Sequence, residues 1–68
     1  MPVLNRLRIV REARALSQVE LARRSRIAQS TLSRLENGRQ EAQPSTLRQL
    51  ARTLRVKPTD LYVQVAMS

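Results

Sequence analysis

The chain has 68 residues, a formal net charge of +8, and neither cysteine nor histidine. A chain of this length forms one small domain with a single core, and the missing thiols and imidazoles exclude disulfides, thiolate catalysis and the usual zinc sites. Its five acidic residues are scattered and offer no nucleophile paired with a base, so we expect no enzyme. The basic excess instead favours a polyanion, with nucleic acid first, as the partner.

No apolar run approaches the roughly 18 residues of a membrane span, and the N-terminal segment lacks the apolar block of a signal peptide. The sequence therefore predicts a cytoplasmic protein without a membrane partner. We also expect no cofactor and no small-molecule ligand, because so small a domain has room for one core but not for a deep cleft.

Apolar residues recur every three or four positions along most of the chain, which predicts a single all-α domain spanning residues 1–68. Leu4 and Leu7 belong to the apolar face of the first helix. Pro44 and Pro58 stand where a first helical residue tolerates proline, and so mark the starts of the fourth and fifth helices. The five predicted helices cover residues 3–14, 18–24, 29–36, 44–55 and 58–66.

Local signals mark both ends of the segment that holds the second and third helices. Ser17 and Glu20 have the spacing of a capping box, in which each side chain binds the backbone N–H of the other residue. Asn37 and Gly38 signal a chain reversal after the third helix. Two short helices around a tight connection are therefore expected between these signals.

The third helix, residues 29–36, has two unlike faces. Leu32 and Leu35 recur at helical spacing and should be buried. The opposite face carries polar side chains and one arginine, which we expect to be exposed as a reading surface. The residues of this surface are Gln29, Ser30, Ser33 and Arg34.

The C-terminal segment is more apolar than a solvated chain end requires. Its alternating pattern fits either a strand or a continuation of the fifth helix, and the residues alone leave both open. In either form it could serve as a homodimer interface or as a docking site for another protein. The residues concerned are Tyr62, Val63, Val65 and Met67.

Three segments of the chain combine these features, namely QVELARRS, IAQSTLSRLENG and TLRQLARTLRV. Together they resemble the Cro and phage-repressor type helix-turn-helix family, also called the xenobiotic response element family, over nearly the whole chain. The resemblance implies a compact five-helix, lambda-repressor-like domain whose third helix enters the major groove of double-stranded DNA. It also implies a homodimer on a palindromic operator.

The same resemblance implies roles for individual side chains. The base-reading residues would be Gln29, Ser30, Ser33 and Arg34. Their chemistry fits, because glutamine can bond adenine, serine can donate or accept, and arginine is the commonest reader of guanine. Arg11 and Glu36 would form a partly buried ion pair between the first helix and the end of the third. The phosphate contacts would come from Arg11, Ser17, Gln18, Asn37 with its neighbouring backbone N–H groups, and Arg39.

The chain departs from the family pattern at several positions. Ala15, Arg26 and Arg55 stand where the family often has glycine, and each would cost about 1 kcal/mol if the backbone there is left-handed. Ala28 stands where the family usually has a capping Ser or Thr, which gives up roughly 1 kcal/mol of cap stabilisation and one DNA contact. These departures affect the turn that sets the entry angle of Gln29.

The sequence therefore predicts a sequence-specific, double-stranded DNA-binding transcriptional regulator that acts as a homodimer and associates with the nucleoid when bound. The alternative is an antitoxin-like interaction protein of the same fold, whose main partner is another protein and whose DNA binding is autoregulation. A stable homodimer in sedimentation would favour the regulator, whereas a monomer that co-purifies with a second small protein would favour the alternative.

Overall fold

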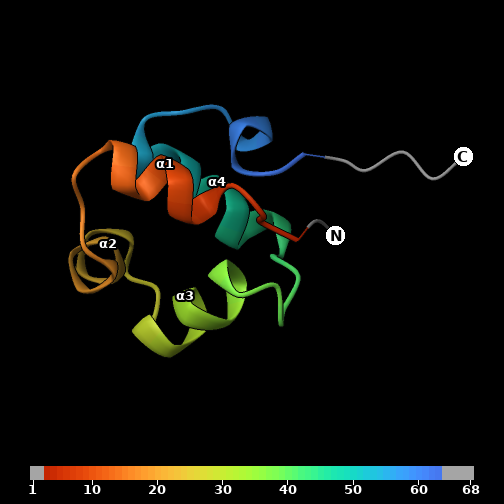
Figure 1. Ribbon diagram of the computed structural model, residues 1–68, viewed down its shortest axis with the longest axis horizontal. Coiled ribbons are helices and arrows are strands. Elements are labelled where there is room, and N and C mark those ends of the chain that lie inside the picture. The colour runs from red at the N-terminus through yellow and green to blue at the C-terminus, as the bar shows by residue number, and fades with distance from the viewer. Residues whose placement is uncertain (1–2, 64–68) are drawn as a thin grey trace, which may run out of the picture.

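The computed structural model describes residues 3–63, and every regular element within this range is a helix. The elements are α1 (Leu7–Ala13), α2 (Gln18–Ser25), α3 (Gln29–Glu36), α4 (Pro44–Leu54) and a 3-10 helix, η1 (Pro58–Leu61), as shown in Figure 1. The predicted all-α class is confirmed, whereas the predicted count of five α-helices is wrong. None of the helices in this range is long and apolar enough to cross a membrane.

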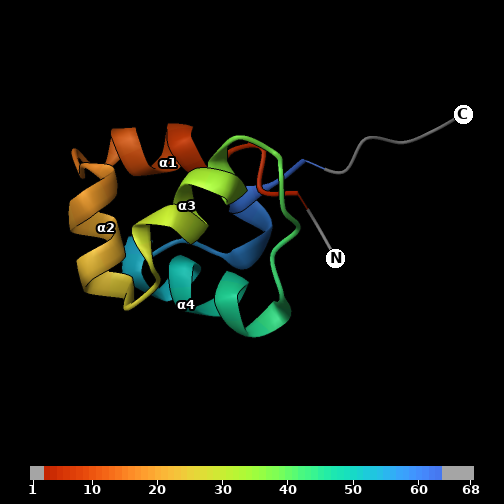
Figure 2. The same cartoon turned by 90° about the horizontal axis from the view of Figure 1, so that it is seen from below.

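The helices surround one shared core. Helix α2 packs against both α3 and α4, α1 packs against α3 and η1, and η1 packs against α4. In Figure 1, α1 and α3 lie on opposite sides of the bundle, with α2 at one end. One long side of α3 consequently faces outward, and Figure 2 views the molecule from that side.

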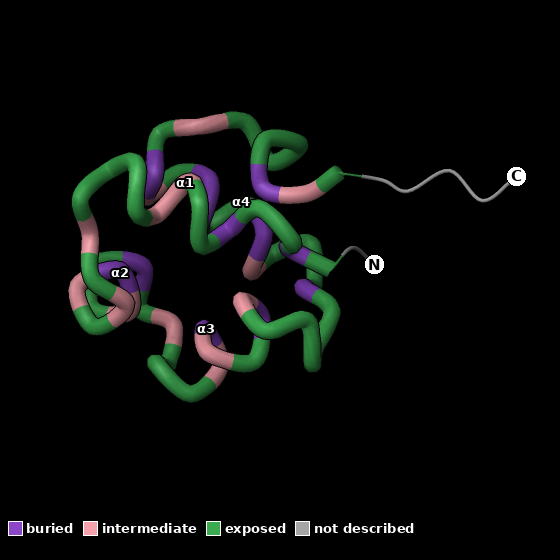
Figure 3. The backbone as a smooth tube through the Cα atoms, viewed as in Figure 1, coloured by how far each residue is buried: buried purple, intermediate pink, exposed green. Residues whose placement is uncertain are grey.

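Leucines from all five elements and the segment before α1 fill the core, and Figure 3 shows where the buried positions lie along the backbone. The buried members are Leu4, Leu7, Leu21, Leu32, Leu35, Ala42, Leu47, Leu50, Ala51, Leu54 and Leu61. Burying one leucine side chain stabilises the fold by about 1.5 to 3 kcal/mol, so these residues are the main source of stability. The inward face predicted from helical spacing in α3 is confirmed, and α4 buries Leu47, Leu50, Ala51 and Leu54 in the same way.

The first helix begins four residues later than predicted, at Leu7. The Arg6 N–H donates to the carbonyl oxygen of Leu61 at 3.1 Å, so the segment before α1 is tied to η1. The Asn5 side chain donates to the Val63 carbonyl at 3.3 Å and accepts the Val63 N–H at 2.8 Å. The two ends of the described chain are therefore bound side by side, and the N-terminal residues serve this contact rather than a helical turn.

The predicted fifth helix is wrong in type and in length within the described range. Pro58–Leu61 forms a single 3-10 turn, after which Tyr62 has an extended backbone with φ −152° and ψ 155°. The N–H and carbonyl of Val63 bond to the Asn5 side chain instead of to a helical turn. A contact with the distant N-terminal segment thus ends the helix, and the remainder of the prediction, residues 64–66, lies outside the described residues.

Among residues 3–63, three residues other than glycine have a left-handed backbone. The φ angle is 57° at Ala15, 61° at Arg26 and 60° at Arg55. Arg26 and Arg55 are the C-caps of α2 and α4, where a left-handed residue ends a helix. The expected strain is therefore present at all three sites, at about 1 kcal/mol each, and is partly offset because a residue with a side chain is also less free when unfolded.

Candidate nucleic-acid interface

Helix α3 turns its polar face to solvent. Leu32 and Leu35 have no exposed surface, so the helix is fixed to the core along one side. The residues on the other side are Gln29, Ser30 and Arg34, which are exposed, and Ser33, which is half-buried. The structure therefore brings all four predicted reading residues together on one face of one helix.

The N-termini of α2 and α3 are capped differently. The Ser17 hydroxyl accepts the Glu20 N–H at 3.0 Å, which confirms one half of the predicted capping box. The Glu20 carboxylate instead binds Arg23 and Arg24 at 2.6 and 2.9 Å, and these hydrogen bonds lower the pKa of Glu20 to about 2. Helix α3 has Ala28 at its N-cap with no side-chain cap bond, as the sequence predicts.

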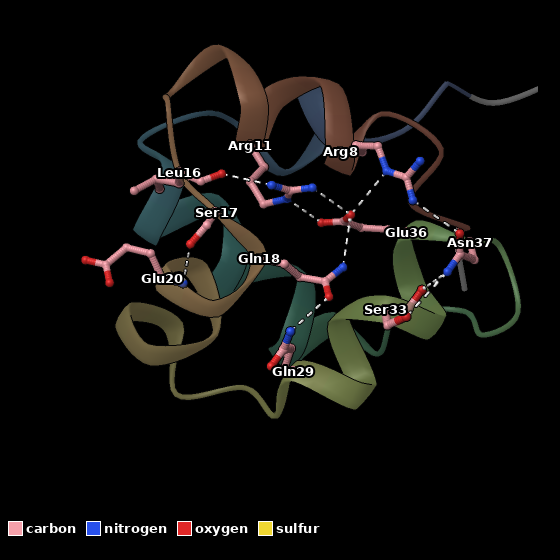
Figure 4. A network of polar contacts seen from close by, with 10 residues as sticks. All are labelled: Arg8, Arg11, Leu16, Ser17, Gln18, Glu20, Gln29, Ser33, Glu36 and Asn37. Carbon is pink, nitrogen blue, oxygen red and sulfur yellow. Dashed lines mark hydrogen bonds and ion pairs between the residues drawn. The ribbon is translucent and has the colours of Figure 1, made fainter.

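A line of polar contacts joins the first residue of α3 to its last (Figure 4). Gln29 Nε2 donates to Gln18 Oε1 at 3.5 Å, and Gln18 Nε2 donates to Glu36 Oε1 at 3.3 Å. Because an ionised carboxylate can only accept, the amide nitrogen of Gln18 must face Glu36 and its oxygen must face Gln29. The start of α2 therefore orients the first side chain of the candidate reading surface.

The carboxylate of Glu36 is the centre of this network. Its side chain has no exposed surface, and Arg11 binds both oxygens, with Nε at 2.7 Å from Oε2 and Nη2 at 3.1 Å from Oε1. Arg8 Nε lies 3.4 Å from Oε1. Burial alone raises the pKa of Glu36, but the hydrogen bonds from Arg11, Gln18 and Arg8 outweigh it, and the pKa lies below its ordinary value. The group is therefore ionised at neutral pH.

Arg11 is used mainly inside the molecule. Its Nη1 donates to the carbonyl oxygen of Leu16 at 2.9 Å, while Nε and Nη2 bind Glu36, and only 11% of its side chain is exposed. The hydrogen bond to Glu36 raises the pKa of Arg11, so the guanidinium stays charged. This geometry joins α1 to the start of α2 and the end of α3, and a phosphate contact by Arg11 stays a prediction.

Asn37 is exposed but engaged within the fold. Its Nδ2 donates to the carbonyl of Ser33 at 2.8 Å, and its Oδ1 accepts Arg8 Nη2 at 3.3 Å. The backbone N–H groups of Asn37, Gly38 and Arg39 all donate to carbonyls of α3. The N–H groups that the resemblance places against phosphates thus end the helix here, and their contact with DNA stays a prediction.

Three side chains that link the elements around this surface were not predicted from the sequence. Arg8 binds Glu36 and Asn37, and its spacing of three from Arg11 could have placed both on one helix face. Arg14 donates to the carbonyls of the last residue of α4 and its C-cap, at 3.0 and 3.4 Å. Gln49 donates to the carbonyl of Ser25. The last two bind backbone carbonyls, which no sequence pattern marks as acceptors.

A groove of about 520 Å³, lined by both apolar and charged side chains, lies between α1 and η1, on a different side of the molecule from α3. Ile9 and Val63 border it and are 57% and 53% exposed. Tyr62, another residue of the predicted dimer interface, also lines the groove. Val65 and Met67, the remaining predicted interface residues, lie outside the described residues. The described part of the prediction therefore coincides with a groove that combines exposed apolar side chains with charged ones.

Comparisons with known proteins agree with this architecture. A family model described as Helix-turn-helix matches residues 7–61. The restriction-modification controller protein C.AhdI from Aeromonas hydrophila is 33% identical, with a TM-score of 0.80, over 85% of this chain and 88% of that one. An HTH_3 family transcriptional regulator from Vibrio cholerae has a TM-score of 0.80 at 24% identity over 87% of this chain, which spans 33% of that protein. No protein with a curated description matches. The predicted lambda-repressor-like fold is confirmed.

Proposed function

Because the chain belongs to the helix-turn-helix family whose model matches residues 7–61, we propose that it is a sequence-specific, double-stranded DNA-binding transcriptional regulator. The observation that carries the proposal is the exposed polar face of α3, whose opposite face is buried. An α-helix fits the major groove of B-DNA, where each base pair presents a distinct pattern of donors and acceptors. The similarity to C.AhdI, a restriction-modification controller protein, supports the regulator class. Such a protein binds DNA without catalysing a reaction.

In this proposal the outer face of α3 reads base edges. Gln29, held from behind by Gln18, has the amide that pairs with adenine, and Ser30 beside it can donate or accept. Arg34, one turn further along, has the fork that matches guanine, and each good bidentate pair discriminates by about 1 to 3 kcal/mol. Ser33 is half-buried and accepts Asn37 Nδ2 at 3.4 Å, so it supports the edge of the surface.

The phosphate backbone meets the start of α2 and the turn after α3 in the same proposal. The Ser17 hydroxyl accepts a bond from its own helix and keeps its proton to donate to a phosphate oxygen. Gln18 lies next to it, and Arg39 is exposed just beyond α3. The polar groups of Arg11 and Asn37 are largely taken up by hydrogen bonds within the protein, so these two residues mainly position the segments that meet the phosphates. Contacts of this kind set the register of the protein on DNA without reading sequence.

We further propose that two copies form a homodimer through the groove between α1 and η1. A two-fold dimer places two α3 helices on one side of DNA and reads palindromic half-sites about one helical turn apart. Ile9 and Val63 are both exposed and line the same groove, and apolar side chains that gather in one place on a surface, unlike single ones, mark protein interfaces. A regulator of this kind works in the cytoplasm, associated with the nucleoid while it is bound.

Sedimentation of two matched variants tests the dimer. Ile9 borders the groove, whereas Val19 is 58% exposed on α2 outside it. We expect the unaltered chain and Val19→Glu to sediment as dimers and Ile9→Glu as a monomer, because a charged side chain in place of an apolar one must be desolvated when the interface forms. A monomeric unaltered chain that forms a stoichiometric complex with a second small protein would instead favour the antitoxin-like alternative, which would use the same groove.

Selection of bound sites from random duplex DNA tests the proposed function. We expect one enriched motif with two-fold symmetry and half-sites separated by about 10 base pairs, centre to centre. Each half-site should contain an adenine and a guanine within reach of Gln29 and Arg34. Binding that enriches no motif at physiological salt would refute the sequence-specific role, and an enriched motif without symmetry would refute the homodimer alone.

A further inference from the structure

The guanidinium of Arg34 is held on two sides. Its Nε donates to Gln40 Oε1 at 2.9 Å, and its Nη2 donates to Thr31 Oγ1 at 3.4 Å. Thr31 belongs to the same helix one turn earlier, whereas Gln40 belongs to the loop after α3. An exposed arginine ordinarily samples many rotamers, and contacts from two different segments select one of them. Arg34 is therefore oriented before any ligand binds.

Gln40 reaches Arg34 because of the turn that ends α3. Gly38 has a left-handed backbone with φ 71°, and its N–H donates to the Leu35 carbonyl at 3.3 Å. The Arg39 N–H donates to the Arg34 carbonyl at 2.9 Å, which completes a Schellman motif. The chain thus folds back over the last turn of the helix, and the residue that follows the motif lies beside Arg34.

The two contacts leave the reading end of the guanidinium available. A guanidinium carries its N–H donors in a rigid planar fork. Gln40 takes the Nε–H on one side, and Thr31 takes a proton of Nη2. The remaining Nη protons lie at the far end of the fork, which is the end that pairs with O6 and N7 of guanine. An amide is also neutral, so it orients Arg34 without placing a negative charge beside the phosphates.

We propose that Gln40 is a positioning residue that fixes Arg34 for base recognition and thereby sets specificity at one base pair of each half-site. The inference rests on the proposed function, since it takes DNA as the ligand of α3. Its basis is the 2.9 Å bond between the two side chains and the Schellman motif that builds it. Gln40 touches no base itself and acts through Arg34.

The test measures discrimination base pair by base pair for Gln40→Ala. Gln43→Ala is the matched control, because Gln43 is an exposed glutamine of the same loop and makes no side-chain cap bond. Restoring the rotamer freedom of one long side chain should lower discrimination at the base pair read by Arg34 by about threefold to tenfold. Gln43→Ala should keep the profile of the unaltered protein. Gln40→Glu should keep the discrimination but weaken binding to all sequences alike.

A double-substitution cycle excludes a merely structural role. Gln40→Ala added to Arg34→Ala should lose no further discrimination, because the positioning residue then has nothing to position. The inference fails if Arg34→Ala loses discrimination while Gln40→Ala keeps it. It also fails if Gln40→Ala binds more tightly with an unchanged profile, since Gln40 would then compete with DNA for Arg34. An unaltered protein that prefers no sequence would overturn the proposed function itself.

Discussion

Replacing Glu36 with alanine is expected to lower the free energy of unfolding by about 3 to 5 kcal/mol, the usual cost of stranding one member of a buried ion pair. The Glu36 side chain has no exposed surface and the Arg11 side chain is 11% exposed, so the guanidinium would be left without a counter-charge close to the core. A domain of this size has a total stability of about 3 to 10 kcal/mol, which makes the loss comparable to the whole. Urea denaturation followed by circular dichroism measures it.

Glu20 provides the matched control. It also binds two arginines, Arg23 and Arg24, at 2.6 and 2.9 Å, but their side chains are 70% and 55% exposed. Exposed ion pairs are screened by water and contribute little. Glu20→Ala should therefore unfold at nearly the same urea concentration as the unaltered protein. Equal losses at both positions would contradict the assignment of Glu36 as the structural centre of the network.

The lowered pKa of Glu36 also makes the free energy of unfolding depend on pH. The pKa of Glu36 in the folded protein lies below its ordinary value, because hydrogen bonds from Arg11, Gln18 and Arg8 outweigh the effect of burial. A lowered folded pKa means that this stabilisation is complete above the unfolded pKa of about 4.3 and is lost as the pH falls through the folded value. Glu36→Gln should therefore flatten the acid limb of the stability profile, whereas an unchanged limb would show that Glu36 titrates normally.

The buried face of α3 could be predicted because it depends on local spacing. Leu32 and Leu35 are three residues apart, and Gly38 ends the helix through a backbone angle that glycine adopts freely. The N-cap of α2 could be predicted for the same reason, because the Ser17 hydroxyl and the Glu20 N–H that it accepts are only three residues apart. Features of this kind need no knowledge of the rest of the molecule.

The contacts that arrange the candidate site could not be predicted, because they join residues far apart in the chain. Asn5 binds the backbone of Val63 and ends the C-terminal helix that periodicity alone would extend. Arg8 has an exposed side chain of a kind that ordinarily faces solvent, yet it binds Glu36. No pattern in the sequence singles out Gln40, although the turn at the end of α3 brings it to Arg34. In each case tertiary geometry selects one partner among many that the sequence allows.

The substitutions Arg34→Ala and Arg39→Ala each remove one positive charge near the end of α3, but they should weaken DNA binding in different ways. Arg34→Ala is expected to relax preference at one base pair of each half-site, by the roughly 1 to 3 kcal/mol that a bidentate guanine contact supplies. Arg39→Ala should weaken binding to all sequences and reduce the slope of log K against log salt by about one, the sign of one lost phosphate contact. Fluorescence anisotropy on matched and mismatched duplexes at several salt concentrations measures both.

Neither variant should disturb the turn after α3, because the bond between the Arg39 N–H and the Arg34 carbonyl uses backbone atoms alone. Lys57→Ala is the charge-matched control. Lys57 is exposed and belongs to the link between α4 and η1. This link runs on the side of the molecule away from α3 (Figure 1). Lys57→Ala should leave both the base preference and the salt slope almost unchanged. Identical losses from Arg34→Ala and Arg39→Ala on every duplex would mean that Arg34 meets a phosphate, and α3 would then read the groove through Gln29 and Ser30 alone.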